Sequence, residues 1–132
     1  MVRIKDIMHE ITLVSANESV KGVAEVMRNK DIGSVMVKRG DEICGILTER
    51  DIICKVVAAG KDPEKTEAQD IMTEKIITIS ADATILEASE FLNRYKVRRI
   101  PAVDKDGKIV GIVSARGVAK ALEKIYKTVT PF

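Results

Sequence analysis

The two halves of this 132-residue chain repeat each other. The block Lys5-Asp6-Ile7-Met8 returns as Gln69-Asp70-Ile71-Met72, and Gly45-Ile46-Leu47-Thr48 returns as Gly111-Ile112-Val113-Ser114. The offset grows from 64 residues at the first block (Met8 to Met72) to 66 at the second (Gly45 to Gly111). The two copies therefore differ in length only by short insertions between these blocks. Self-similarity of this kind predicts one structural unit folded twice.

The copies differ at one polar position. Thr48-Glu49-Arg50-Asp51 in the first half corresponds to Ser114-Ala115-Arg116-Gly117 in the second, so an acidic side chain is present in one copy only. A carboxylate accepts hydrogen bonds that glycine has no side chain to accept. We therefore expect the functional difference between the halves at this position.

The spacing of apolar residues predicts the same order of elements in each half: strand, helix, strand, strand, helix. Turn residues at 39–41 and 104–107 join the paired strands into hairpins. The predicted elements lie at 13–14, 20–27, 34–37, 43–47 and 52–57 in the first half, and at 77–80, 85–92, 99–103, 108–113 and 118–125 in the second.

This order of elements predicts a mixed α/β (α+β) fold made of two repeats, residues 1–64 and 65–132. Neither repeat alone has enough apolar layers to close a core, so we expect the two to pack through their sheets about a pseudo-twofold axis. Between the repeats, Thr66-Glu67-Ala68-Gln69 is read as a capping box that starts a short helical turn at 70–72.

Composition and charge exclude several classes of function. The 22 basic and 20 acidic residues are interspersed, which disfavours nucleic acid as a partner. We find no apolar run that could span a bilayer and no charged-then-apolar leader, so a soluble, cytoplasmic protein without membrane contact is expected. Cys44 and Cys54 lack metal or redox spacing and are predicted to be buried, reduced thiols, and the lone His9 to be a surface or cap residue.

The doubled series of Asp-Ile-Met openings and Gly-Ile-x-Thr-x-x-Asp closings, with Ile100-Pro101-Ala102-Val103 between the second pair, resembles a tandem pair of CBS (cystathionine-β-synthase-type) domains, also called a Bateman module. The resemblance extends from Ile4 to about Leu122. It implies a non-catalytic module that binds AMP, ADP, ATP or S-adenosylmethionine in clefts between the repeats, and requires no cofactor beyond that regulatory ligand.

The resemblance assigns roles to the closing motif. Thr48 would approach the ribose or phosphate, and Asp51 would hold the ribose diol with its two carboxylate oxygens. By position, the rest of this cleft would be formed by Ile46, Arg50, Ile77, Thr78, Ile79, Ser80, Val97, Arg98 and Arg99. Either of the paired arginines could contact phosphate, or both could be solvated charges at a strand edge.

A purely structural interpretation of Thr48 and Asp51 remains open, because a hydroxyl followed three residues later by an acid is also a helix-capping box. The two roles can coexist. In the second cleft Gly117 replaces the acid, so weaker occupancy is expected there. Its predicted residues are Leu13, Ser15, Ile32, Ile112, Ser114 and Arg116.

Three classes of function are compared. The first is a sensor whose adenosine ligand alters its affinity for a separate, unidentified partner protein. The second is a ligand-independent adaptor that only dimerises. An enzyme is disfavoured, because the chain has no phosphate-loop or Gly-x-Gly-x-x-Gly pattern and no nucleophile with a base nearby.

A homodimer is expected through apolar side chains of the second helices, namely Ile53, Val57, Val118, Leu122 and Ile125.

Overall fold

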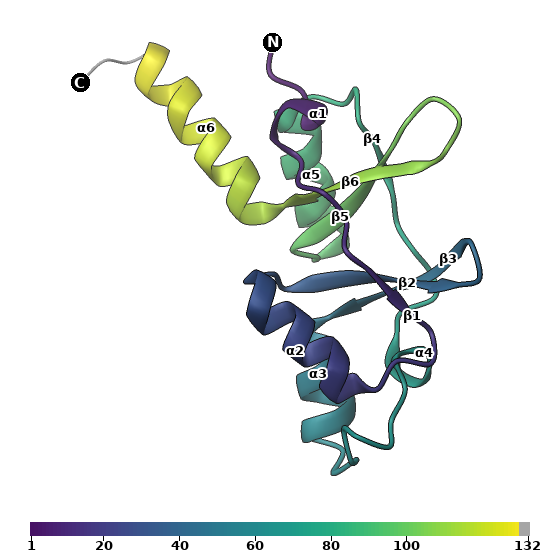
Figure 1. The fold of residues 1–132 in the computed structure, drawn as a ribbon. Coiled ribbons are helices and arrows are strands. Elements are labelled where there is room, and N and C mark those ends of the chain that lie inside the picture. The colour runs from purple at the N-terminus through teal and green to yellow at the C-terminus, as the bar shows by residue number, and fades with distance from the viewer. Residues whose placement is uncertain (130–132) are drawn as a thin grey trace. The chain divides into compact units, whose positions relative to one another are not determined.

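The computed structural model describes residues 1–129, which form two compact units (Figure 1). The central unit is the continuous stretch Thr12–Ile76. The terminal unit combines Met1–Ile11 with the chain from Ile77 onward. Residues 130–132, the end of the predicted second repeat, lie outside the described part of the chain.

The central unit contains one three-stranded sheet and four short helices. Its sheet has the order β1-β2-β3, with β1 parallel to β2 and β2 antiparallel to β3. Figure 1 shows α2 and α3 on the same face of this sheet. In chain order the elements are β1 (Leu13–Ser15), α2 (Val20–Lys30), β2 (Ser34–Arg39), β3 (Glu42–Thr48), α3 (Glu49–Ile52), the π-helix η1 (Ile53–Val57) and α4 (Ala68–Ile71).

The terminal unit repeats this topology. Its sheet has the order β4-β5-β6, again with a parallel and then an antiparallel pair. Its elements are α1 (Ile4–Ile7), β4 (Ile79–Ser80), α5 (Ile85–Tyr95), β5 (Arg99–Val103), β6 (Ile109–Ser114) and α6 (Ala115–Val129). The mixed α/β class and the predicted order of elements are confirmed, although β4 is shorter than the run 77–80.

The first long helix of each unit begins and ends in the same way. The hydroxyl of Ser19 accepts a hydrogen bond from the backbone N–H of Gly22 at 3.0 Å, and that of Thr84 accepts one from Glu87 at 3.2 Å. Such caps satisfy N–H groups that have no partner within the helix. Each helix ends at a left-handed residue, Asp31 or Lys96, with φ of 53°. Duplicated local sequence therefore produces duplicated local structure.

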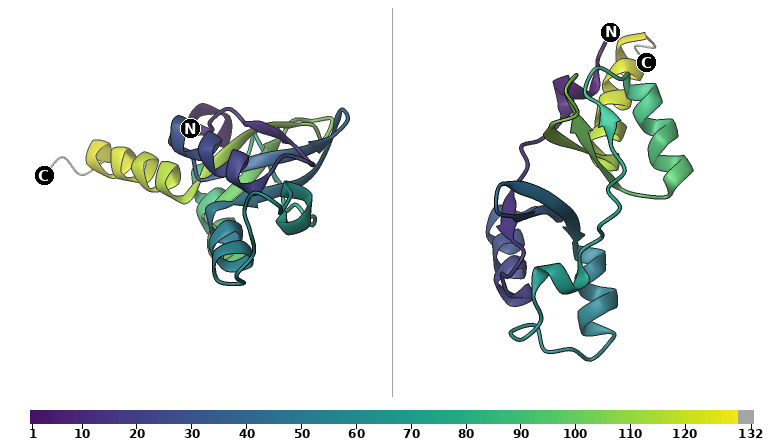
Figure 2. Two further views of the ribbon diagram at one scale, coloured as in Figure 1. Left: turned by 60° about the horizontal axis from the view of Figure 1, so that its bottom comes forward. Right: turned by 90° about the vertical axis from the view of Figure 1, so that its right-hand side faces the viewer.

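Each core is completed by the opening segment of the other repeat. The buried Ile4 belongs to the core of the terminal unit, whereas Ile71 and Met72 belong to that of the central unit. Figure 2 shows the purple segment with α1 beside the strands of the terminal unit. Backbone hydrogen bonds fix this arrangement, from Ile4 N to Ala83 O at 2.9 Å and correspondingly from Ala68 N to Glu18 O at 2.8 Å. The exchange supplies the apolar surface that a repeat lacks alone.

The aspartate of each Asp-Ile-Met block is a helix cap. Oδ2 of Asp6 accepts a hydrogen bond from Arg3 N at 2.8 Å, and Oδ2 of Asp70 accepts one from Glu67 N at 2.8 Å. The predicted capping box starting at Thr66 is therefore wrong by one residue. Thr66 is instead buried and donates to the carbonyl oxygen of Asp62 at 2.8 Å.

Two burial predictions are also corrected. Cys54 lies on the exposed side of η1 and Cys44 is only half-buried, so the pair are not buried thiols. Val118 is 3% exposed in the core of the terminal unit, whereas Ile53, Val57, Leu122 and Ile125 are exposed as expected. The inward position of Val118 follows from its place at the start of α6, where the helix leaves β6.

Candidate functional site

The closing motif of the central unit places a buried carboxylate at the start of α3. Asp51 is 8% exposed, and its Oδ2 accepts hydrogen bonds from the backbone N–H of Thr48 at 2.9 Å and from the Thr48 hydroxyl at 3.2 Å. The same hydroxyl accepts a hydrogen bond from Asp51 N at 3.2 Å. These reciprocal bonds form a capping box, so the structural role of the pair is present.

The second oxygen of Asp51 faces two side chains from other segments. Nζ of Lys55, one turn later, lies 3.0 Å from Oδ1 and also donates to the carbonyl oxygen of Ile71 at 3.0 Å. The hydroxyl of Thr73 donates to Oδ1 at the longer distance of 3.5 Å. One carboxylate oxygen is thus occupied by the cap, and the other has partners that a ligand can replace.

Thr73 reaches this site because the segment after α4 runs beside β3. Ile46 and Thr73 form an antiparallel bridge, with N–H···O distances of 3.0 and 2.8 Å. Ile46, a predicted ligand contact, is 9% exposed beside it. The predicted residues Ile46, Thr48 and Asp51 therefore lie at one end of β3, and Arg50 is exposed on α3 next to them.

The other residues predicted for the Asp51 cleft belong to the terminal unit. Ile79 and Ser80 form β4 and pair with Ala102 and Val103 of β5, while Ile77 and Thr78 precede that strand. Val97, Arg98 and Arg99 lead into β5, where Arg99 is the register partner of Ser114. A cleft that combines them with Asp51 stays a prediction. The same holds for the second cleft, because Leu13, Ser15 and Ile32 belong to the central unit whereas Ile112, Ser114 and Arg116 belong to the terminal unit.

The terminal unit has the same backbone at its closing motif but different side chains. His9 and Ile112 form the bridge equivalent to that of Thr73 and Ile46, with both N–H···O distances at 2.9 Å. The hydroxyl of Ser114 accepts a hydrogen bond from Gly117 N at 3.0 Å, so the helix cap is kept. The carboxylate is not, because Gly117 takes the place of Asp51.

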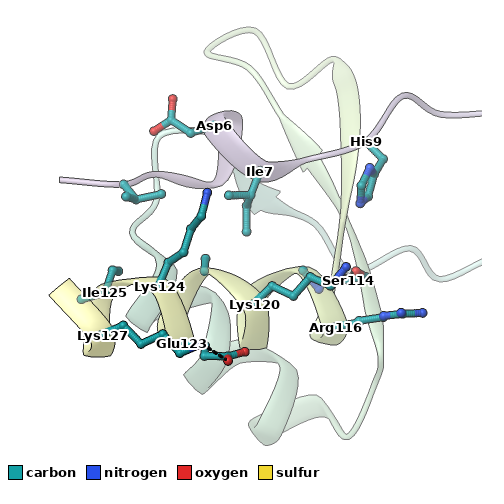
Figure 3. A pocket seen from close by; sticks show the side chains of 13 residues that line it. Asp6, Ile7, His9, Ser114, Arg116, Lys120, Glu123, Lys124, Ile125 and Lys127 are labelled. Atoms are coloured by element: carbon teal, nitrogen blue, oxygen red, sulfur yellow. Dashed lines mark hydrogen bonds and ion pairs between the residues drawn. The ribbon is translucent and has the colours of Figure 1, made fainter. Parts of the chain in front are cut away.

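A cavity of about 710 Å³ lies in the terminal unit where α6 passes the segment containing α1 (Figure 3). Ser114, Gly117 and His9 line it at the motif, and Lys120 and Lys124 line it along α6. Sequence reasoning identified Ser114 and Arg116 but missed His9, Thr73 and Lys55. The sequence signal that could have identified His9 and Thr73 is their equivalent position, directly after each Asp-Ile-Met block.

Two further features are absent from the part of the chain that the structure describes. No group of three or more histidine, cysteine or acidic side chains is arranged there to hold a metal ion. Among the same residues, no helix is both long and apolar enough to cross a bilayer.

Curated relatives share this sequence over most of its length. An uncharacterized protein of Methanopyrus kandleri is 38% identical over 116 residues, which are 87% of this chain and 59% of that protein. The chain therefore spans about three fifths of that relative. Hypoxic response protein 1 of Mycobacterium tuberculosis is 34% identical over 124 residues, which are 92% of this chain and 86% of that protein.

Solved structures share the fold. A crystal structure of Hypoxic Response Protein I with two coordinated zinc ions has a TM-score of 0.73 at 33% identity, covering 92% of this chain and 99% of that one. A structure of CBSX2 in complex with AMP has a TM-score of 0.77 at 22% identity, covering 95% and 98%. The CBS domain family itself matches residues 4–58 and 68–124. The chain therefore belongs to the CBS domain family and contains two copies of that domain.

Proposed function

We propose that this chain is a non-catalytic regulatory module that binds an adenosine-containing ligand, AMP, ADP, ATP or S-adenosylmethionine, at the closing motif of the central unit. Ligand occupancy would be transmitted to a separate partner protein in the cytoplasm. The observation that carries the proposal is the buried carboxylate of Asp51, which is oriented by Thr48 and has one oxygen directed away from the cap.

The chemistry of Asp51 suits a sugar hydroxyl. Oδ2 already accepts two hydrogen bonds from Thr48, so a diol bridging both oxygens would compete with the cap. The interactions of Oδ1 are weaker, because the Thr73 hydroxyl is 3.5 Å away and the side chain of Lys55, its ion-pair partner, is 45% exposed. We therefore assign one ribose hydroxyl to Oδ1. A carboxylate already held in one rotamer binds such a donor with little loss of side-chain entropy.

The remaining contacts follow from the family pattern. Adenine would lie against Ile46 and the segment 77–80, beside Val97, and the exposed Arg98 or its neighbour Arg99 would meet phosphate, since guanidinium groups match phosphate oxygens. The CBSX2 structure contains AMP, which supports an adenosine ligand in this family. At 22% identity, that structure supports a shared fold for this chain and does not indicate its ligand. The ligand is therefore to be identified by experiment.

Titration calorimetry and thermal shift with AMP, ATP and S-adenosylmethionine test the proposal. At 100 times its dissociation constant, a ligand of the native state adds about 2.7 kcal/mol to stability. Asp51→Asn should remove most of this response. Asp70→Asn is the matched control, because Asp70 caps α4 of the same unit through the same kind of bond. Equal responses of both variants and the wild type would remove Asp51 from the site.

One observation favours a second candidate, a ligand-independent dimerising adaptor. Ile53 and Val57 on η1 are 58% and 70% exposed, an arrangement that suits a protein interface. Sedimentation of the wild type beside Ile53→Lys measures this directly. A dimer that the substitution dissociates, together with no thermal response to any adenosine compound, would favour the adaptor over the sensor.

A further inference from the structure

Two sulfur atoms that the proposed function does not use lie in contact in the central unit. Sγ of Cys44, in β3, is 3.8 Å from Sδ of Met72, which follows α4. The two residues are 28 positions apart in the chain, so the tertiary fold brings them together. A thioether cannot form a disulfide with a thiol. The contact is therefore either ordinary packing or a pair of soft ligands.

The thioether of Met72 is held in place by a glycine. Met72 is 8% exposed in the core of the central unit, and its Sδ lies 2.5 Å from where a Cβ on Gly45 would stand. The sulfur thus fills the space that the glycine leaves. The bridge between Ile46 and Thr73, with N–H···O distances of 3.0 and 2.8 Å, fixes the two segments at this separation. A ligand atom held in this way binds with little loss of side-chain entropy.

The thiol of Cys44 lies at a bulge in the sheet. The register between β2 and β3 shifts between Val37 and Lys38, so Cys44 is the extra residue of β3 at this point. Its S–H donates to the carbonyl oxygen of Val37 at 3.5 Å. Cys44 is half-buried whereas Met72 is buried, so an ion would enter the pair from the Cys44 side.

The terminal unit repeats this packing without the thiol. Sδ of Met8 lies 2.5 Å from the place of a Cβ on Gly111, the same distance as in the central unit. Val110 is the extra residue of β6 and takes the place of Cys44. Because valine fills the equivalent position, packing at the bulge does not require a sulfur atom. The central unit therefore adds a thiol to a thioether arrangement that both copies share.

The two sulfurs suit a soft metal ion. Thiolate and thioether ligands select Cu(I) over harder cations, and monovalent copper and silver form stable complexes with two sulfur ligands. Two metal–sulfur bonds of about 2.3 Å each span at most about 4.6 Å, so one ion can bond both atoms at their separation of 3.8 Å. A structural zinc ion takes four ligands in a tetrahedron, and this pair offers two.

We propose that Cys44 and Met72 bind one soft monovalent cation of the Cu(I) class, for which Ag(I) is a redox-inert probe. Binding breaks the S–H bond of Cys44, releases its proton to solvent and forms one bond from the ion to each sulfur. No electron is transferred. The site lies within the central unit and needs neither Asp51 nor an adenosine ligand, so it does not rest on the proposed function.

Silver titration of the full chain, labelled with ¹³C at the methionine methyl groups, tests the geometry by NMR. Cys54→Ser removes the other, exposed thiol, so one equivalent of Ag(I) has a single cysteine to bind. We expect the methyl resonance of Met72 to shift with that equivalent and the resonance of Met8, whose unit has no thiol, to stay in place. An unmoved Met72 resonance, or equal shifts of the two methyl groups, would overturn the proposal.

Paired substitutions measure what each sulfur contributes to Cu(I) affinity. All are made in the Cys54→Ser chain and titrated without oxygen against a chromogenic Cu(I) chelator. Cys44→Val copies the terminal unit and should weaken binding at least about a hundredfold. Met72→Leu should weaken it about tenfold, whereas Met8→Leu, which changes the same packing in the other unit, should not. Equal affinities of the two leucine variants would reduce the site to a simple thiol and contradict the proposal.

The terminal unit allows the site to be built anew. Val110→Cys places a thiol at the equivalent bulge beside Met8, so the Cys54→Ser chain should then bind a second equivalent of Ag(I) and the methyl resonance of Met8 should shift. Silver binding that left this resonance unmoved would show that a thioether seated on glycine is no ligand, and the proposal would fail. Circular dichroism and the unfolding midpoint confirm that each variant is folded before it is titrated.

Discussion

The two closing motifs, 48–51 and 114–117, share their backbone conformation and differ in the side chains that they present. In the central unit the N–H of Glu49 donates to Gly33 O at 3.0 Å, and in the terminal unit that of Ala115 donates to Arg98 O at 2.8 Å. On this shared frame the first motif holds a carboxylate paired with an ammonium, and the second opens into a cationic cavity. Duplication preserved the scaffold, and a few side chains changed what each copy can bind.

The largest difference should appear when Asp51 is removed. Asp51→Ala should weaken binding of the adenosine ligand by about tenfold to a hundredfold, because the charge-assisted hydrogen bond of about 1.5–3 kcal/mol between Oδ1 and the ribose hydroxyl is lost. Calorimetric titration with AMP measures this. The matched variant Asp51→Glu should retain the thermal midpoint, since glutamate also caps at this position, yet bind more weakly because its carboxylate is displaced. Undiminished affinity in both would contradict the ribose role.

The glycine in the last strand of each sheet, Gly45 in β3 and Gly111 in β6, should be equally sensitive to substitution in both units. A Cβ at Gly45 would lie 2.5 Å from Met72 Sδ and 3.1 Å from Thr73 O, and one at Gly111 would meet Met8 Sδ and His9 O at the same distances. Gly45→Ala and Gly111→Ala should each lower the free energy of unfolding by about 1–3 kcal/mol through overcrowding.

Chemical denaturation measures this pair of variants. Gly117→Ala serves as the control, because its Cβ has space and alanine favours the helix, so its stability should not fall. A loss confined to one of the two strand glycines would show that the close approach of the bridging segment is needed in one unit only.

The element order and the motif could be predicted from sequence because they depend on local patterns. The caps at Ser19 and Thr84 and the hairpins are set by residues a few positions apart. The exchange of opening segments could not be predicted in this way. Ile4 and Ile71 are apolar in either arrangement, and only the three-dimensional path of the chain decides which core they enter.

The candidate site was predicted only in part, because some of its contacts are local in sequence and others depend on the path of the chain. Thr48 and Asp51 are three residues apart, so their capping geometry follows from helix structure. Lys55 is also local, but its charge could as well have been solvated, as most helix lysines are. Thr73 lies 22 residues from Asp51, and its contact depends on the bridge with Ile46, which periodicity does not reveal.

Restoring the missing acid should stabilise the terminal unit. Gly117→Asp recreates the Ser/Thr-x-x-Asp cap, removes a flexible glycine from the first turn of α6 and places a negative charge near the positive end of its dipole. We expect the free energy of unfolding to rise by about 0.5–1.5 kcal/mol. Denaturation with urea measures the change, and Gly117→Ala separates the contribution of the cap from that of the backbone. A destabilised variant would show that the two motifs are not equivalent.

A smaller effect should follow from freeing Oδ1 of Asp51. Lys55→Met removes the ammonium that competes for this oxygen while keeping the apolar part of the side chain. Because the Lys55 side chain is 45% exposed, its pairing contributes little, and the affinity for adenosine should rise by only about twofold to fivefold. Titration with adenosine, which has no phosphate, isolates this effect. Lys61→Met is the control on the same unit, and weaker adenosine binding by Lys55→Met would make Lys55 a ligand contact instead.

The smallest expected difference concerns how each opening segment is held. The N–H groups of Lys5 and Gln69 donate to Ala81 O and Ala16 O, both at 2.9 Å, but only Lys5 adds an ion pair, with Asp82 at 3.0 Å. The hydrogen bond and charge of Lys5 lower the pKa of Asp82. A lowered pKa means that the pair stabilises the fold above the unfolded value of about 4 and ceases to do so as the pH falls through the folded value.

Amide exchange followed from pH 6 to pH 3 compares the two segments directly. The protection factor of the Lys5 amide should decline slightly over the lower part of this range. Gln69 accepts a hydrogen bond from Arg39 at 3.1 Å and has no such ion pair among the described residues, so the protection factor of its amide should follow global stability alone. Asp82→Asn should remove the difference between the two amides. If both amides lost protection in parallel in the wild type, the ion pair would have no part in holding the N-terminal segment, and the backbone bonds common to both units would account for the exchange of segments by themselves.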